Sequence, residues 1–333
     1  MTFAIAILNY NGSILLKRFI PEIIKNCEGA RIYLIDNKST DLSVNFIKKN
    51  YSQISVIQLD SNYGYASGYN LGLKKINEDV VIFLNNDAVF KDKESFSELC
   101  KTFVSNKSIS IAQPRILDYN NIEKYEYAGA SGGYLDFLCY PFCRGRIINK
   151  IESSEKYKTT REIFWASGSC FAIRKVIFDE LNGFDDDFFC HMEEIDLCWR
   201  LKHIKPNHKI ITIGKSTVYH IGGGTMQYDS TKKSYLNFRN SIMMMIKNLP
   251  KSYIIPVLFL RFIMDLLIVL YHMVFLKFKT SFSILSAYFY NIINFKHNYL
   301  KRSHRKKYKY YYYCRSILFE YYFFKKKSFS SLK

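Results

Sequence analysis

The chain has 333 residues, enough for one large α/β domain and an appendage, and its formal net charge is +19. The positive charge is concentrated at the end, because residues 251–333 contain 16 Lys and Arg against two acids, whereas residues 1–250 contain 32 against 27. Eight cysteines without a CxxC pair argue against a disulfide framework or a zinc site, and they favour reduced thiols in the cytosol.

Four apolar runs in the first 90 residues each predict a strand that is buried on both faces, because they are too continuous for half-exposed strands. Helical stretches separate the runs. Since parallel neighbours need a crossover connection, this alternation predicts a doubly wound, mostly parallel α/β sheet flanked by helices. The predicted strands cover residues 3–8, 31–35, 54–59 and 80–84, and the predicted helices cover Ser13–Asn26, Asp41–Asn50 and Ala66–Ile76.

All four predicted strands end in Asn or Asp, whereas simple turns would use more Gly, Ser and Pro. Ligands of open α/β sheets bind beyond the carboxyl ends of the strands, so we expect a nucleotide site there. Asp36 can accept a hydrogen bond from a ribose or a base, and Asp87 can hold Mg²⁺ or Mn²⁺ beside a diphosphate. The candidate residues at the strand ends are Asn9, Asn11, Asp36, Asn62, Asn85, Asn86 and Asp87.

A glycine-rich loop follows the third predicted strand. Gly64 and Gly68 allow close approach of the backbone, and the helix that begins there can direct N–H groups towards a phosphate. Asn70 is a further substrate-binding candidate on the same segment. The spacing is not GxGxxG, and tight packing of the loop on the sheet explains the glycines equally well.

Residues 183–200 form the densest polar run, with three acids at Asp185–Asp187 and helical character from Glu194 to Leu201. Glu193 and Glu194 lie at the start of that helix, where acids either complement the helix dipole or provide a general base. Asp196, on the same helix, is a substrate-binding candidate. Further along, His220 precedes three glycines and can act as a metal ligand or a pyrophosphate contact.

The end of the chain predicts a membrane-associated tail over residues 251–333. Residues 254–276 are a 23-residue apolar stretch, long enough to cross a bilayer. Arg261 and Asp265 near its middle cost about 5–7 kcal/mol together, which offsets most of the roughly 5–10 kcal/mol from its Leu, Ile, Val and Phe. This balance favours a helix in the interface, or a shallow hairpin with residues 282–295, over a clean span.

A basic and aromatic cluster at Lys301–Tyr313 follows the apolar stretch and suits anionic headgroups. A nucleic-acid-binding tail would also interleave basic and aromatic residues, but it would not adjoin a long apolar segment. We therefore expect an anionic membrane surface, and no nucleic acid, as the partner of this region.

Taken in order, eight motifs resemble the inverting family 2 glycosyltransferases with a GT-A fold, and among them the rhamnosyltransferase-like enzymes of bacterial cell-surface polysaccharide assembly. The resemblance covers about residues 1–245, which predicts a transferase domain over 1–250. The motifs are ILNYNG, IDNKSTD, NYGYASGYNLG, FLNND, FWASGSCFAIR, GFDDDFFCHMEEIDLCWRL, VYHIGGGT and YLNFRN.

This resemblance implies roles for individual residues. Asp36 would hold the nucleobase side of the donor. Asn85-Asn86-Asp87 stands where the family has its DxD metal motif, with Asn85 in place of the first Asp, so Asp87 would bind the metal with help from His220. Glu193-Glu194 matches the family's Glu-Asp pair and makes Glu194 the expected catalytic base, with the assignment within the pair left open.

The resemblance also implies that Trp165, Ser167 and Gly168 shape the sugar and acceptor pocket and that Arg239 lies near the diphosphate. The implied reaction moves a sugar, with inversion, from a UDP- or dTDP-linked donor to a lipid-linked or glycan acceptor at the cytoplasmic side of the cell membrane, using Mg²⁺ or Mn²⁺. Three alternatives stay open at this point: a processive polysaccharide synthase, a dolichol-phosphate-type transferase and a non-catalytic sugar-nucleotide binder. The oligomeric state is not predicted.

Overall fold

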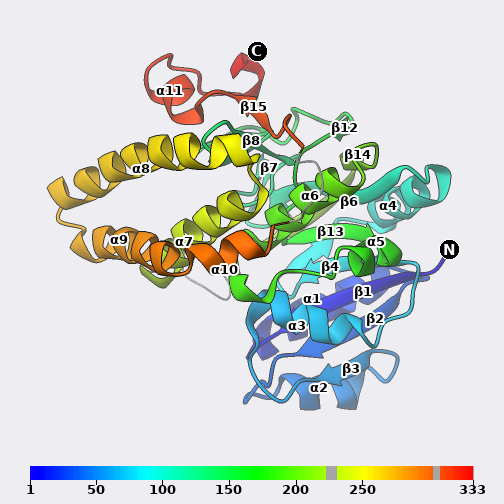
Figure 1. Ribbon diagram of the computed structural model, residues 1–333. Helices are drawn as coiled ribbons and strands as arrows, with labels where there is room; N and C mark the ends of the chain where they lie inside the picture. The colour runs from blue at the N-terminus through cyan, green and yellow to red at the C-terminus, as the bar shows by residue number, and fades with distance from the viewer. Residues whose placement is uncertain (223–230, 303–307, 333) are drawn as a thin grey trace.

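The computed structural model describes residues 1–222, 231–302 and 308–332 (Figure 1). Parallel strands form one half of its main sheet and confirm the predicted buried strands. In spatial order they are β3 (Ser55–Gln58), β2 (Arg31–Asp36), β1 (Phe3–Asn9) and β4 (Val80–Asn85).

Helices α1 (Ser13–Asn26), α2 (Ser43–Asn50) and α3 (Gly64–Leu73) connect these strands, close to the predicted positions. Side chains of β1 alternate between two apolar cores. Ala4 and Ala6 pack in the core that includes α3, whereas Ile5 and Ile7 pack in the core that includes α1. Burial on both faces is the physical reason why the sequence of this strand is continuously apolar.

The other half of the main sheet continues from β4 as β13 (Cys170–Arg174), β6 (Ile109–Asp118), β14 (Lys209–His220) and β12 (Arg161–Glu162). Strand β13 runs antiparallel to β4 and β6, and β14 runs parallel to β6. Two short strands pair at the side of this half, β5 (Ala88–Phe90) with β14 and β7 (Asn121–Tyr125) with β6. Because Ala88 lies opposite His220, this pairing brings His220 beside Asp87.

Helices α4 (Lys93–Ser105), α5 (Lys175–Glu180) and α6 (Glu193–Ile204) accompany this half, and the short 3₁₀ helix η1 (Asp186–Phe188) precedes α6. The predicted helical run after Glu193 is therefore confirmed as α6. All eight cysteines are free thiols, in agreement with the absence of a CxxC pair.

A second sheet packs near β14 and α6 and consists of β11 (Lys150–Ile151), β10 (Arg146–Ile147), β9 (Pro141–Cys143), β8 (Gly133–Asp136) and β15 (Tyr312–Cys314). Strand β15 comes from the predicted tail and pairs in parallel with β8, so the end of the chain returns to the body of the protein. Helices α7 (Thr231–Asn248), α10 (Phe295–Leu300) and α11 (Ile317–Tyr322) and the 3₁₀ helix η2 (Phe329–Leu332) complete the described part.

Helices α8 (Lys251–Val274) and α9 (Phe278–Ile293) form an arm, residues 251–293, that projects to one side of the sheets in Figure 1. Among the described residues, α8 is the one helix long and apolar enough to cross a membrane, with a mean hydropathy of 2.3, and only 28% of its apolar window is buried in the protein. Such a helix suggests membrane association.

The charged pair of α8 faces inward, so the sequence-based expectation that it would oppose insertion needs correction. Arg261 Nε donates to Asp265 Oδ2 at 2.9 Å, and the Arg261 guanidinium lies over the Tyr140 ring, 3.7 Å from its centroid. Asp265 also accepts hydrogen bonds from the hydroxyls of Tyr140 and Tyr288. The pair is therefore neutralised within the protein, and the exposed face of α8 carries neither charge.

Candidate active site

The ends of β1, β2 and β4 meet in a buried hydrogen-bonded cluster. Asn9 Nδ2 donates to Asp36 Oδ1 at 3.1 Å, and Asn86 Nδ2 donates to Asn9 Oδ1 at 3.0 Å. Asp36 also accepts from the backbone N–H of Ser39 at 2.9 Å and from its hydroxyl at 2.6 Å. These bonds fix the Asp36 carboxylate at the sheet edge, and they add Ser39 of the IDNKSTD motif to the residues expected there.

Asn11 and Asn62 lie on exposed loops at the same rim, where their side chains shape the backbone. Asn11 Oδ1 accepts from the N–H of Thr40 at 2.7 Å, and Asn62 Oδ1 accepts from the N–H of Gly64 at 3.0 Å. Both side chains therefore stabilise loops beside the Asp36 cluster.

Asp87 and His220 are in direct contact. His220 Nε2 lies 3.0 Å from Asp87 Oδ1, and the Nδ1 atom lies 3.6 Å from Glu126 Oε2. Burial disfavours a charged imidazole, but the hydrogen bond to Asp87 and the negative charges of Asp87 and Glu126 raise the pKa of His220 to about 10. The glycines at 223 and 224 lie outside the described residues.

Glu126 was missed by the sequence analysis. It is buried just after β7, and its Oε2 atom is held by the N–H of Ala128 at 2.7 Å. The segment KYEYAG around it has no recognisable pattern, so only the pairing of β7 with β6 beside β14 brings this carboxylate to His220.

Glu194 lies beside the turn that precedes β13. A Cβ atom at Gly168 would be 3.8 Å from the Glu194 carboxyl carbon and 3.1 Å from the Tyr65 hydroxyl. Burial raises the pKa of Glu194 to about 7, and backbone N–H groups around it limit the rise. Burial, with the negative charge of Glu194, raises the pKa of the neighbouring Glu193 further. Burial therefore holds the pKa of both carboxyls above that of an ordinary glutamate, more strongly for Glu193 than for Glu194.

A short chain of contacts joins the Asp87–His220 pair to the segment beside Glu194. The N–H of Asn85 donates to the carbonyl of Ser169 at 3.0 Å, and the neighbouring Gly168 carbonyl accepts from the Tyr65 hydroxyl at 2.7 Å. Asn85 Nδ2 also lies 3.4 Å from His220 Nε2. The antiparallel pairing of β13 with β4 thus brings the segment beside Glu194 to the strand end that leads into Asp87.

Trp165, Ser167 and the two glycines of the third loop have mainly packing contacts. Trp165 donates from Nε1 to the carbonyl of Tyr134 at 3.0 Å and covers Gly133, so it joins the two sheets. Ser167 is buried, and its N–H donates to Gln113 Oε1 at 2.8 Å. Gly64 lies against the Phe189 ring and Gly68 against the side chains of Asn37 and Leu8. These contacts favour the tight-packing alternative for that loop.

Two other predicted substrate contacts, Asn70 and Arg239, hold the segment 183–188. Asn70 Nδ2 donates to the Phe184 carbonyl and to Asp186 Oδ1, both at 2.8 Å. Arg239 Nη2 donates to the carbonyls of Asp187 and Phe188.

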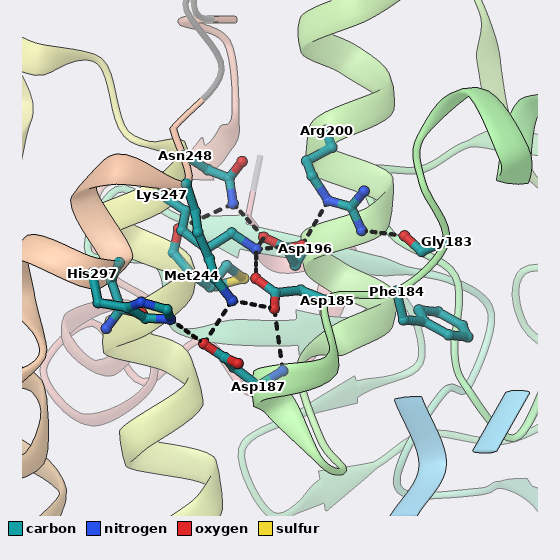
Figure 2. Close-up of polar contacts among 12 residues, drawn as sticks. Gly183, Phe184, Asp185, Asp187, Asp196, Arg200, Met244, Lys247, Asn248 and His297 are labelled. Carbon is teal, nitrogen blue, oxygen red and sulfur yellow. Dashed lines mark hydrogen bonds and ion pairs between the residues drawn. The ribbon is translucent and has the colours of Figure 1, made fainter. Parts of the chain in front are cut away.

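The prediction for Asp196 is wrong, because its side chain is completely buried. It pairs with Arg200 at 2.7 Å and with Lys247 at 3.0 Å (Figure 2). A buried carboxylate with two cationic partners holds helices together and cannot contact a substrate.

A family model described as "Glycosyl transferase family 2" matches residues 4–182, more than half of the chain. The chain belongs to this family. This family 2 glycosyltransferase is 25% identical over 249 residues to the low-salt glycan biosynthesis hexosyltransferase Agl10 of Haloferax volcanii, an alignment that covers 72% of this chain and 74% of that protein.

A second relative is the N-acetylglucosaminyl-diphospho-decaprenol L-rhamnosyltransferase of Mycobacterium tuberculosis, which is 24% identical over 56% of this chain and 66% of its own length. Among solved structures, GalNAc-T7 with UDP, GalNAc and Mn²⁺ superimposes with a TM-score of 0.59 at 18% identity, over 76% of this chain and 49% of that chain. The likeness confirms the predicted GT-A fold of this glycosyltransferase.

Proposed function

We propose that this glycosyltransferase moves a hexosyl or rhamnosyl group, with inversion, from a UDP- or dTDP-linked sugar to a lipid-linked or glycan acceptor in cell-surface polysaccharide biosynthesis. The observation that carries the proposal is the contact chain from Asp87 and His220 through Asn85 and Ser169 to Gly168 beside Glu194. The names of relatives that transfer hexose or rhamnose, one of them to a diphospho-decaprenol lipid, support the choice of substrates.

Glu194 acts as the general base in this proposal. Its carboxylate takes the proton of an acceptor hydroxyl while that oxygen attacks the anomeric carbon of the donor sugar and the bond to the diphosphate breaks. One displacement inverts the configuration and needs no enzyme nucleophile. With a pKa of about 7, Glu194 is partly ionised at neutral pH, and the stronger rise in the pKa of Glu193 favours Glu194 as the base.

Asp87 and His220 are the side chains that would hold a divalent ion, with the remaining oxygen ligands coming from the donor diphosphate and water. Their donor set, one carboxylate oxygen and one imidazole nitrogen 3.0 Å apart, would fit Mn²⁺ or Mg²⁺ shared with a substrate once His220 has lost the proton that it shares with Asp87. Within the described ranges no group of three or more His, Cys, Asp and Glu could hold a metal, so the substrate must supply the remaining ligands. The bound ion would neutralise charge on the leaving diphosphate. Asp36 and Ser39 would bind the nucleoside.

The direct test of this function is a panel of nucleoside-diphosphate sugars added to the purified protein with Mn²⁺. Binding to the folded state alone raises apparent stability, so the matching donor is expected to raise the melting midpoint by about 2–4 °C or more at a hundredfold excess over Kd. The same donor is expected to release nucleoside diphosphate when acceptor is supplied. No shift with any UDP or dTDP sugar would contradict the proposal.

We also propose that the arm lies in the cytoplasmic interface of the cell membrane and brings the site to a lipid-linked acceptor. Between residues 252 and 276 the charged side chains are Arg261 and Asp265, and both are buried. The outer face of the arm is therefore a broad apolar surface, which in a protein marks an interaction with a membrane or another protein. Basic residues of the tail favour an anionic membrane. The exposed residues include Ile255, Phe259, Ile263, Leu267, Leu270, Val274, Phe282, Phe289 and Ile292.

Replacing Phe259 and Leu267 by glutamate is expected to weaken co-sedimentation with anionic vesicles at least tenfold. Each side chain is more than half exposed, at 62% and 54%, and burying one in lipid is worth about 1.5–3 kcal/mol. Val104→Glu on α4 is the matched control, since Val104 is an exposed apolar residue outside the arm, at 61%. Equal sedimentation of the double variant and the control would contradict the membrane assignment.

A further inference from the structure

The loop that leads into α6 has an unusual backbone. We call residues 185–192 the base loop, because Glu193 and Glu194 follow it directly. Three of its residues, none of them glycine, have a positive φ: Phe189 with 61°, His191 with 72° and Met192 with 73°. Such conformations are unfavourable and persist only where surrounding contacts over-determine them. The contacts that hold this loop therefore decide where Glu194 lies.

Helix α7 holds the carbonyl groups of the base loop. Asn240 is completely buried, and its Nδ2 donates to the carbonyls of Phe188, Cys190 and His191 at 2.9, 2.8 and 2.7 Å. A single side-chain amide thus holds three of the four carbonyls directly before Met192.

The carboxylates of the base loop are held by the tail of the chain (Figure 2). Lys301, the residue after α10, donates to Asp185 Oδ1 and to Asp187 Oδ2, both at 2.6 Å. His297 Nε2 lies 2.6 Å from the same Asp187 oxygen, and Lys247 of α7 pairs with the other oxygen of Asp185. Lys301 thus bridges the two acids, and it lies far beyond the part of the chain that the family model matches.

On its other side the base loop contacts α3. The carbonyl of Phe189 accepts from the N–H of Tyr65 at 2.6 Å, and the Tyr65 hydroxyl reaches the Gly168 carbonyl beside Glu194. A displacement of the base loop would therefore move both the start of α6 and the tyrosine next to the proposed base.

We propose that Lys301 is a positioning residue for transfer: by bridging Asp185 and Asp187 it holds the base loop in the strained conformation that presents Glu194. The inference rests on the proposed function of Glu194 as the base. Lys301 touches neither the site nor a reacting atom, so its effect is on the placement of the base and not on donor binding.

The test compares Lys301→Met with Lys301→Arg, and with Lys296→Met as the matched control, because Lys296 is an exposed lysine on α10. Lys301→Met is expected to speed amide hydrogen exchange of residues 185–192 at least threefold and to lower kcat about 10–100-fold, since small misplacements of a catalytic group cost this much. The KM for the donor is expected to stay within about threefold. Lys301→Arg should restore most of the wild-type kcat and most of the slow amide exchange. Lys296→Met should match the wild type in both measurements.

Unchanged exchange in the base loop of Lys301→Met, or unchanged kcat, would overturn the inference. Faster exchange over the whole protein with a lower melting midpoint would also overturn it, because this would show general destabilisation. Amide exchange can be measured without turnover, so it tests the contact of Lys301 with the base loop even if the protein is inactive. An inactive wild type would count against the proposed function and not against this contact.

Discussion

Glu194→Gln is expected to lower kcat by about 10²–10⁴-fold, the range that a positioned general base contributes. The amide has the shape of the carboxyl group but cannot take the acceptor proton. Because the pKa of Glu194 is raised to about 7 by burial, the wild-type rate should rise as the pH increases through that value and the base ionises. The variant should lose this dependence. Steady-state kinetics from pH 5.5 to 8.5 measure both effects.

Glu193→Gln is the internal comparison. The pKa of Glu193 is raised well above that of a free glutamate by burial and by the charge of Glu194, which favours the neutral acid, so a neutral amide is expected to change little. We expect its kcat to stay within about tenfold of the wild type. Full activity of Glu194→Gln, or a larger loss in Glu193→Gln, would refute the assignment of the base.

Asp87→Asn is expected to lower activity by about 10²–10³-fold, the scale of losing one group that stabilises developing charge. It should also raise the Mn²⁺ concentration for half-maximal activity at least tenfold, because a carboxylate oxygen ligand is replaced by a neutral amide. A titration with Mn²⁺ at saturating donor measures this change.

Asp92→Asn is a suitable control for that experiment. Asp92 lies near Asp87 in sequence, but its Oδ1 accepts from the N–H of Ser95 at 2.8 Å and caps α4. The same substitution there should cost some stability and leave the Mn²⁺ titration unchanged. If both variants respond to Mn²⁺ like the wild type, Asp87 does not hold the ion.

The strands and the strand-end residues could be predicted because their signals are local. A strand buried on both faces must be apolar throughout, so β1, β2 and β4 stand out in the sequence, and Asn9 and Asp36 follow directly where the burial ends. Parallel neighbours in register then bring these ends together, with Asn9 opposite Asp36. The GT-A resemblance agreed with this pattern, and the family model and the solved structures confirmed it.

The partners of buried charges could not be predicted, because they come from distant segments. Asp196 was placed in the site for its position in a polar run, but its cation, Lys247, is 51 residues away on α7. The apolar stretch predicts that Arg261 opposes membrane insertion, but its guanidinium lies over Tyr140, in the turn between β8 and β9. Glu126 and Lys301 likewise lie in segments without a motif, and only tertiary packing brings them to His220 and the base loop.

In the proposed reaction Asp87 and Glu194 serve one donor in different ways, since Asp87 binds its metal and Glu194 acts in the chemical step. The decisive measurement is the melting midpoint of the wild type, Glu194→Gln and Asp87→Asn, each with the donor that the panel selects, in the presence and absence of Mn²⁺. We predict that Glu194→Gln keeps the stabilisation seen in the wild type and that Asp87→Asn loses its Mn²⁺-dependent part. Equal, Mn²⁺-independent stabilisation of the wild type and Asp87→Asn would contradict the account.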